Sequence, residues 1–214
     1  MYDLYVVTDG ELSLGRTHED VAELSYLGGA DVVQLRDKRM SGLELFNTAV
    51  KIKTLAKEYG KLFIVNDRVD VALASDADGV HLGQSDIPVK AVRKSVPEDV
   101  IIGVSVTSVK EALKAEKDGA DYVALSPVFD TASKDDAGRG KGLDVLREIR
   151  DAVSIPVVAI GGIGPSNASA VIEAGADGIA VISAVVSQPD ITKAATDLRS
   201  IVIEAKIKAS KGHR

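Results

Sequence analysis

The chain of 214 residues contains no cysteine and no tryptophan, and only three asparagines and three glutamines. Without cysteine it forms no disulfide, which is typical of proteins in a reducing compartment, so we expect a cytoplasmic location. It also lacks a run of about 18 apolar residues, so we expect no transmembrane helix. Its first residues, Met1–Leu4, do not show the basic and apolar pattern of a secretory signal.

Basic residues are fewer than acidic ones, 26 against 32, so the formal net charge is −6. This balance argues against a general nucleic-acid binder but leaves room for a local basic pocket that binds a small anion. A hydrophobic content of 45% with 27% charged residues is typical of a globular domain with a sizeable core. We therefore predict one domain over residues 1–208 and a short, basic, disordered tail over residues 209–214.

Short apolar runs alternate with amphipathic segments of helical period along the whole chain. The predicted strands are Leu4–Thr8, Ala30–Leu35, Leu62–Val65, Gly79–Leu82, Ile101–Val106, Tyr122–Leu125, Pro156–Ile160 and Gly178–Ile182. The predicted helices are His18–Leu27, Gly42–Tyr59, Val69–Ala74, Pro88–Ser95, Val109–Asp118, Leu143–Ala152, Pro165–Ala174 and Asp190–Lys208. This alternation predicts an α/β fold, a single-domain (β/α)8 TIM barrel. A doubly wound open sheet is the alternative, but no strand leads into a G-x-G-x-x-G turn.

A short motif of small residues, an aspartate and apolar residues precedes every second predicted strand. Its aspartates are Asp31, Asp78, Asp121 and Asp177. They stand at the amino-terminal ends of strands, whereas such barrels carry their catalytic residues at the opposite ends. We therefore predict a structural role for them, as caps and turn-formers.

Polar side chains alternate at the end of the second predicted strand, at Gln34, Arg36 and Lys38. Successive strand residues point to opposite faces, so these three would share one face if the extended backbone continues. An amide with two cations suits a polyanion such as a diphosphate. The alternative is a polar strand end that enters solvent. The scarce amides favour a site, because Asn66 and Gln84 also follow strand ends.

Two carboxylates, Asp67 and Asp86, follow the third and fourth predicted strands. Neighbouring strands would bring them close, and Mg²⁺ usually takes one or two carboxylates and fills its remaining positions with water and phosphate oxygens. They could equally cap helices, because Asp67 precedes Val69–Ala74 and Asp86 precedes Pro88. Their spacing alone does not decide between these roles.

A glycine-rich turn over Gly161–Pro165 follows the seventh predicted strand, and Ile182 and Ser183 end the eighth. Glycine lets backbone N–H groups approach phosphate oxygens, and a helix amino terminus adds its dipole. The loops after these two strands are the usual phosphate site of such barrels. The pattern predicts binding of a phosphate monoester and nothing more specific. His81, at the fourth strand end, is assigned a supporting role.

The segment over residues 129–141 joins the sixth predicted strand to the next helix and carries Thr131, Ser133 and Lys134 among glycines. A loop of this length in a compact domain is usually functional or disordered. We predict a lid that orders over bound ligand, with a solvated loop as the alternative.

The strand-end residues form one combination of motifs along the chain. It comprises Gln34-Leu35-Arg36-Asp37-Lys38, Asn66-Asp67, His81-Leu82-Gly83-Gln84-Ser85-Asp86, Gly103-Val104-Ser105, Pro127-Val128-Phe129, Thr131, Ser133, Lys134, Gly161-Gly162-Ile163 and Ile182-Ser183. This combination resembles the thiamine phosphate synthase family and spans almost the whole predicted barrel. Two positions depart from the family pattern: Ser126 stands where glycine is usual, and Ser133 replaces a threonine but keeps a hydroxyl group.

The resemblance implies a transferase that joins 4-amino-2-methyl-5-(diphosphooxymethyl)pyrimidine to a thiazole phosphate, forming thiamine phosphate and pyrophosphate. It implies Mg²⁺ as the cofactor, bound by Asp67 and Asp86. The residues implied to hold the pyrimidine diphosphate are Gln34, Leu35, Arg36, Asp37, Lys38, Asn66, Ser105 and Lys134. Those implied to act in catalysis are Arg36, Lys38, Ser105 and Lys134. Those implied to hold the thiazole phosphate are Thr131, Ala132, Ser133, Gly162, Ile182 and Ser183.

Two alternative functions compete with this interpretation. A thiazole tautomerase-like paralogue shares the fold and isomerises the thiazole phosphate alone, and it carries a histidine where this chain has Pro127. A non-catalytic barrel that binds a phosphate ligand is the other. The complete set of cations and acidic residues favours the synthase, whose chemistry needs charge stabilisation and positioning. The sequence does not predict the oligomeric state.

Overall fold

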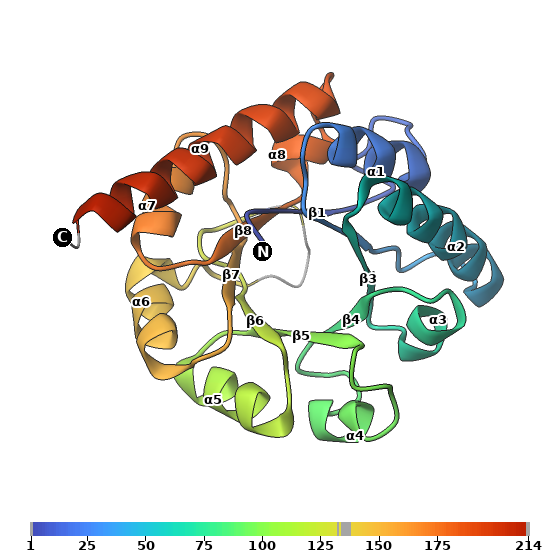
Figure 1. Cartoon of the computed structure of the whole chain (residues 1–214), viewed down its shortest axis with the longest axis horizontal. Helices are drawn as coiled ribbons and strands as arrows, with labels where there is room; N and C mark the ends of the chain where they lie inside the picture. The colour runs from blue at the N-terminus through green and yellow to red at the C-terminus, as the bar shows by residue number, and fades with distance from the viewer. Residues whose placement is uncertain (1, 132, 134–137, 213–214) are drawn as a thin grey trace.

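The computed structural model describes residues 2–131, 133 and 138–212. Eight parallel strands form a closed barrel, in which each strand pairs with its neighbour in the chain and β8 pairs with β1 (Figure 1). The strands are β1 Leu4–Val7, β2 Val32–Leu35, β3 Leu62–Asn66, β4 Gly79–Leu82, β5 Ile101–Val106, β6 Tyr122–Leu125, β7 Val157–Ile160 and β8 Gly178–Val181. The predicted TIM barrel is confirmed.

Helices surround the barrel on its outside (Figure 1). They are α1 His18–Leu27, α2 Gly42–Tyr59, α3 Val69–Ala74, α4 Val89–Arg93, α5 Val109–Asp118, α6 Gly142–Ala152, α7 Ala168–Glu173, α8 Ser183–Val186 and α9 Ile191–Gly212. In the described part of the chain, none of these helices has the length and apolar character needed to cross a membrane.

Two differences from the predicted helices lie near the carboxyl terminus. Helix α8 has no counterpart in the sequence prediction, because a single turn is too short to establish a hydrophobic period. Helix α9 continues to Gly212, so residues 209–212 extend the helix instead of forming the predicted tail. Alanine and lysine favour helix there, and the Ser210 hydroxyl donates to the Ile207 carbonyl at 2.8 Å. Residues 213–214 lie outside the described residues.

Capping boxes fix the first two helices relative to the loops that precede them. In α1 the Thr17 side chain accepts the Asp20 N–H, and the Asp20 carboxylate accepts the Thr17 N–H. In α2 Ser41 and Glu44 make the same reciprocal pair. These contacts satisfy backbone donors that a helix start leaves unpaired, and they end the loops after β1 and β2 at definite positions.

Four aspartates join the strands in pairs at the amino-terminal end of the barrel. Each donates its backbone N–H to the carbonyl of one residue at the start of the preceding strand, and its carboxylate accepts the N–H of that same residue. The pairs are Asp31 with Leu4, Asp78 with Phe63, Asp121 with Ile102 and Asp177 with Val157. The structural role predicted for the repeated aspartates is therefore confirmed.

We expect Asp78→Ala to lower the free energy of unfolding by about 1–3 kcal/mol, because it leaves a buried donor without a partner. The Phe63 N–H donates to the Asp78 carboxylate at 2.8 Å, and Phe63 is fully buried. Urea unfolding followed by circular dichroism measures the change. Asp78→Asn keeps a carbonyl oxygen for this N–H and should lose less. Equal stability of Asp78→Ala and the unchanged protein would contradict this role.

Candidate active site

Two cavities open at the carboxyl-terminal ends of the strands, and Ser126 lines both. The β7–β8 cavity has a volume of about 380 Å³ and is formed mainly by residues after β6, β7 and β8. The β3–β4 cavity has a volume of about 330 Å³. Its lining residues are Arg36, Lys38, Asn66, Asp67, His81, Gly83, Gln84, Ser85, Asp86, Ser105, Thr107 and Ser126. Two ligands bound in these cavities would therefore meet at Ser126.

The β3–β4 cavity brings together most of the residues that the sequence predicts to hold a diphosphate and a metal ion. These residues are Arg36, Lys38, Asn66, Asp67, Asp86 and Ser105. They come from segments far apart in the chain, and closure of the parallel barrel brings their strand ends to one rim. The cavity thus contains two cations and two carboxylates.

The two carboxylates face each other closely enough to interact by a hydrogen bond as well as by charge. Burial and the neighbouring Asp86 raise the pKa of Asp67 to about 6, and Lys38 acts in the opposite direction. Asp67 also has a left-handed backbone, with φ of 60°, which is uncommon for residues other than glycine. The geometry therefore holds two acidic groups together at a cost in free energy.

Neither carboxylate caps a helix, so the helix-cap alternative is wrong. Helix α3 has Arg68 as its N-cap residue and α4 has Pro88, and neither start has a side-chain cap hydrogen bond. Asp86 instead accepts the N–H of Gly83 at 2.6 Å, within its own loop. Asp67 donates its backbone N–H to the carbonyl of His81 at 2.8 Å. These contacts set the backbone and leave a coupled pair of carboxylates in the cavity.

This pair fits Mg²⁺ better than a metal that needs many protein ligands. No cluster of three or more His, Asp or Glu side chains suited to a metal occurs in the described part of the chain. Mg²⁺ needs only one or two carboxylates, because water and substrate phosphate oxygens complete its octahedron. A divalent cation would also relieve the repulsion that raises the pKa of Asp67.

The Arg36 guanidinium is held at the edge of the cavity by Asp9. Its Nη1 lies 3.3 Å from the Asp9 Oδ2, and both side chains are 13% exposed. Asp9 is itself fixed, because its Oδ1 accepts the N–H groups of Glu11 and Leu12 at 3.0 and 3.1 Å. Lys38 lies close enough to act on the pKa of Asp67. Both cations thus line the cavity that contains the acidic pair.

A chain of hydrogen bonds crosses the barrel interior and ends in the β3–β4 cavity. Gln34 Nε2 donates to the Tyr5 hydroxyl at 2.7 Å, and that hydroxyl lies 3.0 Å from the Tyr122 hydroxyl. His81 Nδ1 lies 2.9 Å from the Tyr122 hydroxyl, and its Nε2 lies 2.9 Å from Ser105 Oγ. The predicted supporting role of His81 agrees with these contacts, since its ring orients the Ser105 hydroxyl.

One order of donors is consistent with every contact in this chain. Burial raises the pKa of the Tyr5 and Tyr122 hydroxyls well above the usual range, so each keeps its single proton. In this order the Gln34 amide donates to Tyr5, Tyr5 donates to Tyr122, and Tyr122 donates to His81 Nδ1. A neutral imidazole that accepts at Nδ1 donates at Nε2, here to the Ser105 hydroxyl, whose own hydrogen can then donate to a ligand.

Gln34, Leu35 and Asp37, which the resemblance places among the substrate-binding residues, do not line either cavity. Gln34 is buried at the start of the interior hydrogen-bond chain. Leu35 is fully buried in the core, because alternation along β2 turns it away from the face of Gln34. The Asp37 carboxylate accepts the backbone N–H groups of Arg39 and Met40 at 2.7 and 2.9 Å. The structure therefore gives these three residues positions in the framework around the cavity.

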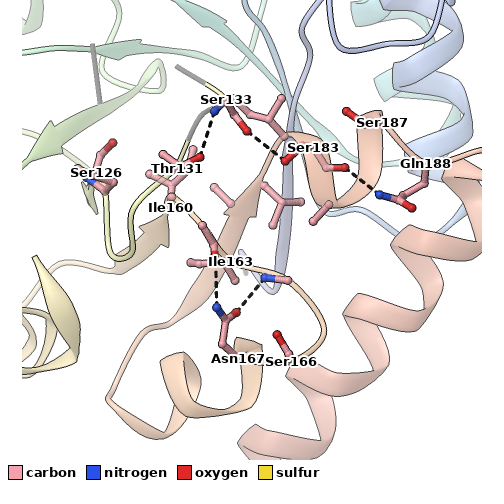
Figure 2. Close-up of a pocket in the computed structure, with 18 residues that line it drawn as sticks. Ser126, Thr131, Ser133, Ile160, Ile163, Ser166, Asn167, Ser183, Ser187 and Gln188 are labelled. Carbon is pink, nitrogen blue, oxygen red and sulfur yellow. Dashed lines mark hydrogen bonds between the residues drawn. The ribbon is translucent and has the colours of Figure 1, made fainter. Parts of the chain in front are cut away.

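The β7–β8 cavity is built on the glycine turn after β7 (Figure 2). Gly162 has φ of 63°, and a Cβ atom there would lie 2.7 Å from the Asp130 carbonyl oxygen, so only glycine fits. Asn167 closes the turn by accepting the Gly164 N–H and donating to the Gly162 carbonyl, each at 2.9 Å. This turn delays α7, which begins at Ala168 and not at the predicted Pro165.

Hydroxyl groups gather on another wall of this cavity (Figure 2). Ser133 Oγ lies 3.0 Å from Ser183 Oγ, and the Ser133 N–H donates to Thr131 Oγ1 at 3.2 Å. None of the described lining residues is charged, so an anion here would rely on hydroxyl and backbone donors. The predicted residues that line the cavity are Thr131, Ser133, Gly162, Ile182 and Ser183. Ala132 and Lys134 lie outside the described residues.

Sequence reasoning missed several polar residues that line the two cavities or support them. Tyr5 and Tyr122 are expected in the core from their positions in apolar strands, and nothing local marks their hydroxyl groups. Asn167 and Gln188 line the β7–β8 cavity, and the scarcity of amides could have indicated them. Gln188 Nε2 donates to the Ser183 carbonyl at 3.1 Å, which supports that wall (Figure 2).

The chain also resembles known proteins over nearly its full length. It matches the family model described as thiamine monophosphate synthase over residues 4–185. It is 59% identical over 205 residues to the thiamine-phosphate synthase of Methanoculleus marisnigri, covering 96% of this chain and 97% of that protein. Identity to the thiamine-phosphate synthase of Methanocella arvoryzae is 56% over 206 residues, covering 96% and 97% of the two chains.

A solved structure gives the same result. The thiamine phosphate pyrophosphorylase from Pyrococcus furiosus superposes with a TM-score of 0.89 at 46% sequence identity, covering 95% of this chain and 96% of that one. A 3-hexulose-6-phosphate synthase superposes with a TM-score of 0.67 at 18% identity, a likeness that shows the fold alone. The sequence identity and the coverage lead to one conclusion: the chain belongs to the thiamine monophosphate synthase family.

Proposed function

We propose that this transferase of thiamine biosynthesis joins 4-amino-2-methyl-5-(diphosphooxymethyl)pyrimidine to a thiazole phosphate and releases pyrophosphate. The observation that carries the proposal is the pair of cavities that share Ser126. One combines cations with a carboxylate pair, and the other is an uncharged cradle of hydroxyl groups and a glycine turn. A diphosphate with a metal ion suits the first, and a phosphate monoester suits the second.

The diphosphate would lie against Arg36, Lys38, Asn66 and Ser105 in the β3–β4 cavity. Asp67 and Asp86 would hold Mg²⁺, which supplies positive charge against the diphosphate when it is bound. Lys134 joins this group by resemblance to the family, and its role is carried by the sequence alone. The thiazole phosphate would lie against residues of the β7–β8 cavity, with Ala132 added by the same resemblance.

The reaction exchanges one bond to the methylene carbon for another. The carbon–oxygen bond to the diphosphate breaks, and its electron pair leaves with the diphosphate oxygen. The thiazole nitrogen then donates its lone pair to form the new carbon–nitrogen bond, and the electron-rich aminopyrimidine stabilises the cation in between. Arg36 and Lys38 take up the growing negative charge, and each such contact is commonly worth about 3–4 kcal/mol of the barrier. Positioning of both substrates at one rim supplies much of the rest.

The tautomerase-like alternative fits this site less well. Isomerisation of the thiazole phosphate alone needs an acid–base residue and makes no use of two cations beside a carboxylate pair. Pro127 lines the β7–β8 cavity at the position where that paralogue carries a histidine. The cation-rich β3–β4 cavity therefore favours the synthase.

Incubation of the purified protein with both substrates and Mg²⁺ tests the proposal. We expect thiamine phosphate and pyrophosphate in equal amounts. Each substrate supplied alone serves as the control and should give neither product in quantity. Isomerisation of the thiazole phosphate without pyrophosphate release would contradict the proposal and support the tautomerase-like alternative.

A cytoplasmic location stays an expectation from the lack of cysteine.

The raised pKa of Asp67 predicts an unusual stability profile. The pKa of about 6 lies above the ordinary value of 3.8, so the contribution of Asp67 to the free energy of unfolding falls as pH rises from about 4 through 6. Asp67→Asn removes this loss and keeps a residue that tolerates the left-handed backbone. In EDTA at pH 8 we expect the variant to be more stable by about 1 kcal/mol, after allowance for solvent screening of a half-buried group.

Urea unfolding at pH 4 and pH 8, with EDTA or with Mg²⁺, measures this effect. The stability difference between the two proteins should vanish at pH 4, and Mg²⁺ should stabilise only the unchanged protein at pH 8. Asp70→Asn is the matched control, because Asp70 is an exposed carboxylate that pairs with Arg68 on α3. A variant that is less stable in EDTA at pH 8 would contradict the raised pKa of Asp67. Equal stabilisation of both proteins by Mg²⁺ would exclude the carboxylate pair as the cation site.

The two cavities should respond separately to substitution. Ser183→Ala removes a hydroxyl group from the β7–β8 cavity and should raise the KM for thiazole phosphate by roughly tenfold or more, the cost of a hydrogen bond to a charged group. The affinity for pyrophosphate, measured by calorimetry with Mg²⁺, should stay nearly unchanged. Ser169→Ala is the control, since this hydroxyl on α7 donates to the Glu173 carboxylate at 3.1 Å and does not line either cavity. Equal weakening of both ligands by Ser183→Ala would show that the two sites are not separate.

A further inference from the structure

The loop that carries the two cations of the β3–β4 cavity is held in place by a buried hydrogen-bond network outside that cavity. The loop leaves β2 after Leu35 and places Arg36 and Lys38 on either side of Asp37. Asp37 lies between the two cations in the chain, so its contacts hold the backbone from which both side chains extend. A fixed backbone at this point limits the positions that the two positive charges can reach.

Asp37 is bound by His18, the first residue of α1. His18 Nε2 lies 3.0 Å from Asp37 Oδ2, and His18 Nδ1 lies 2.7 Å from Thr8 Oγ1 at the end of β1. Thr8 is fully buried and His18 is 5% exposed. Thr8 Oγ1 also accepts the backbone N–H of Arg36 at 3.2 Å. The network thus holds the loop at the Arg36 backbone and again at the Asp37 side chain.

The hydrogen bonds of Asp37 show which atom of His18 donates to it. Burial alone would raise the pKa of Asp37, but the backbone N–H groups of Arg39 and Met40, together with His18, hold it below the usual range. An ionised carboxylate only accepts hydrogen bonds, so His18 donates from Nε2. Thr8 Oγ1 accepts the Arg36 N–H and also lies within hydrogen-bond distance of His18 Nδ1. Both ring nitrogens of His18 therefore have a partner in the network.

The loop after β1 packs closely against this network at Gly10. A Cβ atom at Gly10 would lie 3.2 Å from Asp37 Oδ2 and 3.5 Å from His18 Nε2. The neighbouring Asp9 binds the Arg36 guanidinium from the same loop. A capping box at Thr17 fixes the start of α1 and with it the position of His18. The cationic loop is therefore held by elements that themselves have fixed positions.

We propose that His18 is a positioning residue for diphosphate binding, acting through Asp37 and Thr8 to fix Arg36 and Lys38. This inference rests on the proposed function and assigns Asp37 to the same support, where the family resemblance makes it a substrate contact. Catalysis through charge stabilisation depends on donors that are already in place, and residues that orient the binding groups commonly affect activity by roughly 10- to 100-fold.

The test compares His18→Leu, which keeps an apolar side chain of similar size but no hydrogen bond, with His18→Gln, which keeps a donor toward Asp37. Steady-state kinetics with both substrates and Mg²⁺ should show a KM for the pyrimidine diphosphate raised roughly 10-fold or more in His18→Leu, with a lower kcat. The KM for thiazole phosphate should change little. His18→Gln should recover part of the loss.

Tyr26→Phe is the control for stability alone. Tyr26 lies on the same helix, and its hydroxyl donates to the Leu62 carbonyl at 2.9 Å, at the start of β3 and away from both cavities. It should lose stability without a change in either KM. Thermal unfolding of each variant shows that the protein is folded under assay conditions.

Calorimetry with pyrophosphate and Mg²⁺ gives a second readout, which needs no turnover. Weaker pyrophosphate binding by His18→Leu, with unchanged binding of inorganic phosphate in the β7–β8 cavity, supports the proposal. Equal weakening of both ligands, or a loss of stability with unchanged pyrophosphate affinity, overturns it and makes His18 a structural residue. Failure of the unchanged protein to bind pyrophosphate overturns this inference and the proposed function together, whereas normal synthase activity in His18→Leu overturns the inference alone.

Discussion

Closure of eight parallel strands into one hydrogen-bonded ring is the constraint on which both cavities depend. A parallel ring brings every carboxyl-terminal strand end to one rim, so residues distant in sequence become neighbours there. At the opposite rim, four aspartates each exchange two hydrogen bonds with a backbone residue of the preceding strand, and they do not line the cavities. The fold therefore separates its stabilising polar contacts from the polar groups that remain available to ligands.

The carboxylate pair in the β3–β4 cavity stands out against the satisfied polar groups around it. The interior chain from Gln34 to Ser105 and the network around His18 give their buried donors and acceptors partners. Asp67 and Asp86 instead place like charges together, and the raised pKa of Asp67 records the cost. Natural proteins keep such arrangements chiefly at functional sites, where a ligand offsets the cost.

The sequence predicted the barrel and most of the cavity residues, because strand alternation and strand-end position depend on local pattern. Strand-end position alone identifies three cavity residues: Arg36, Lys38 and Asp67. It could not predict contacts made by residues that look apolar in context, such as Tyr5 and Tyr122, whose hydroxyl groups meet only after the barrel closes.

The same reasoning does not distinguish the residues of a motif that line a cavity from those that do not. Leu35 and Asp37 belong to the motif after β2, but Leu35 faces the core and Asp37 binds His18. The motif alone cannot show which of its members face a ligand, because that depends on the strand's orientation in the closed barrel. His18 carried no signal at all, since it stands beside Asp37 only through the packing of α1 on the barrel.

The central claim is that a diphosphate is held between the cations and a metal ion on the carboxylate pair. Titration of pyrophosphate into the protein, with Mg²⁺ or with EDTA, tests it most directly. We expect tight binding of one pyrophosphate only when Mg²⁺ is present, and loss of that dependence in Asp86→Asn. Equal pyrophosphate affinity in Mg²⁺ and in EDTA would contradict it.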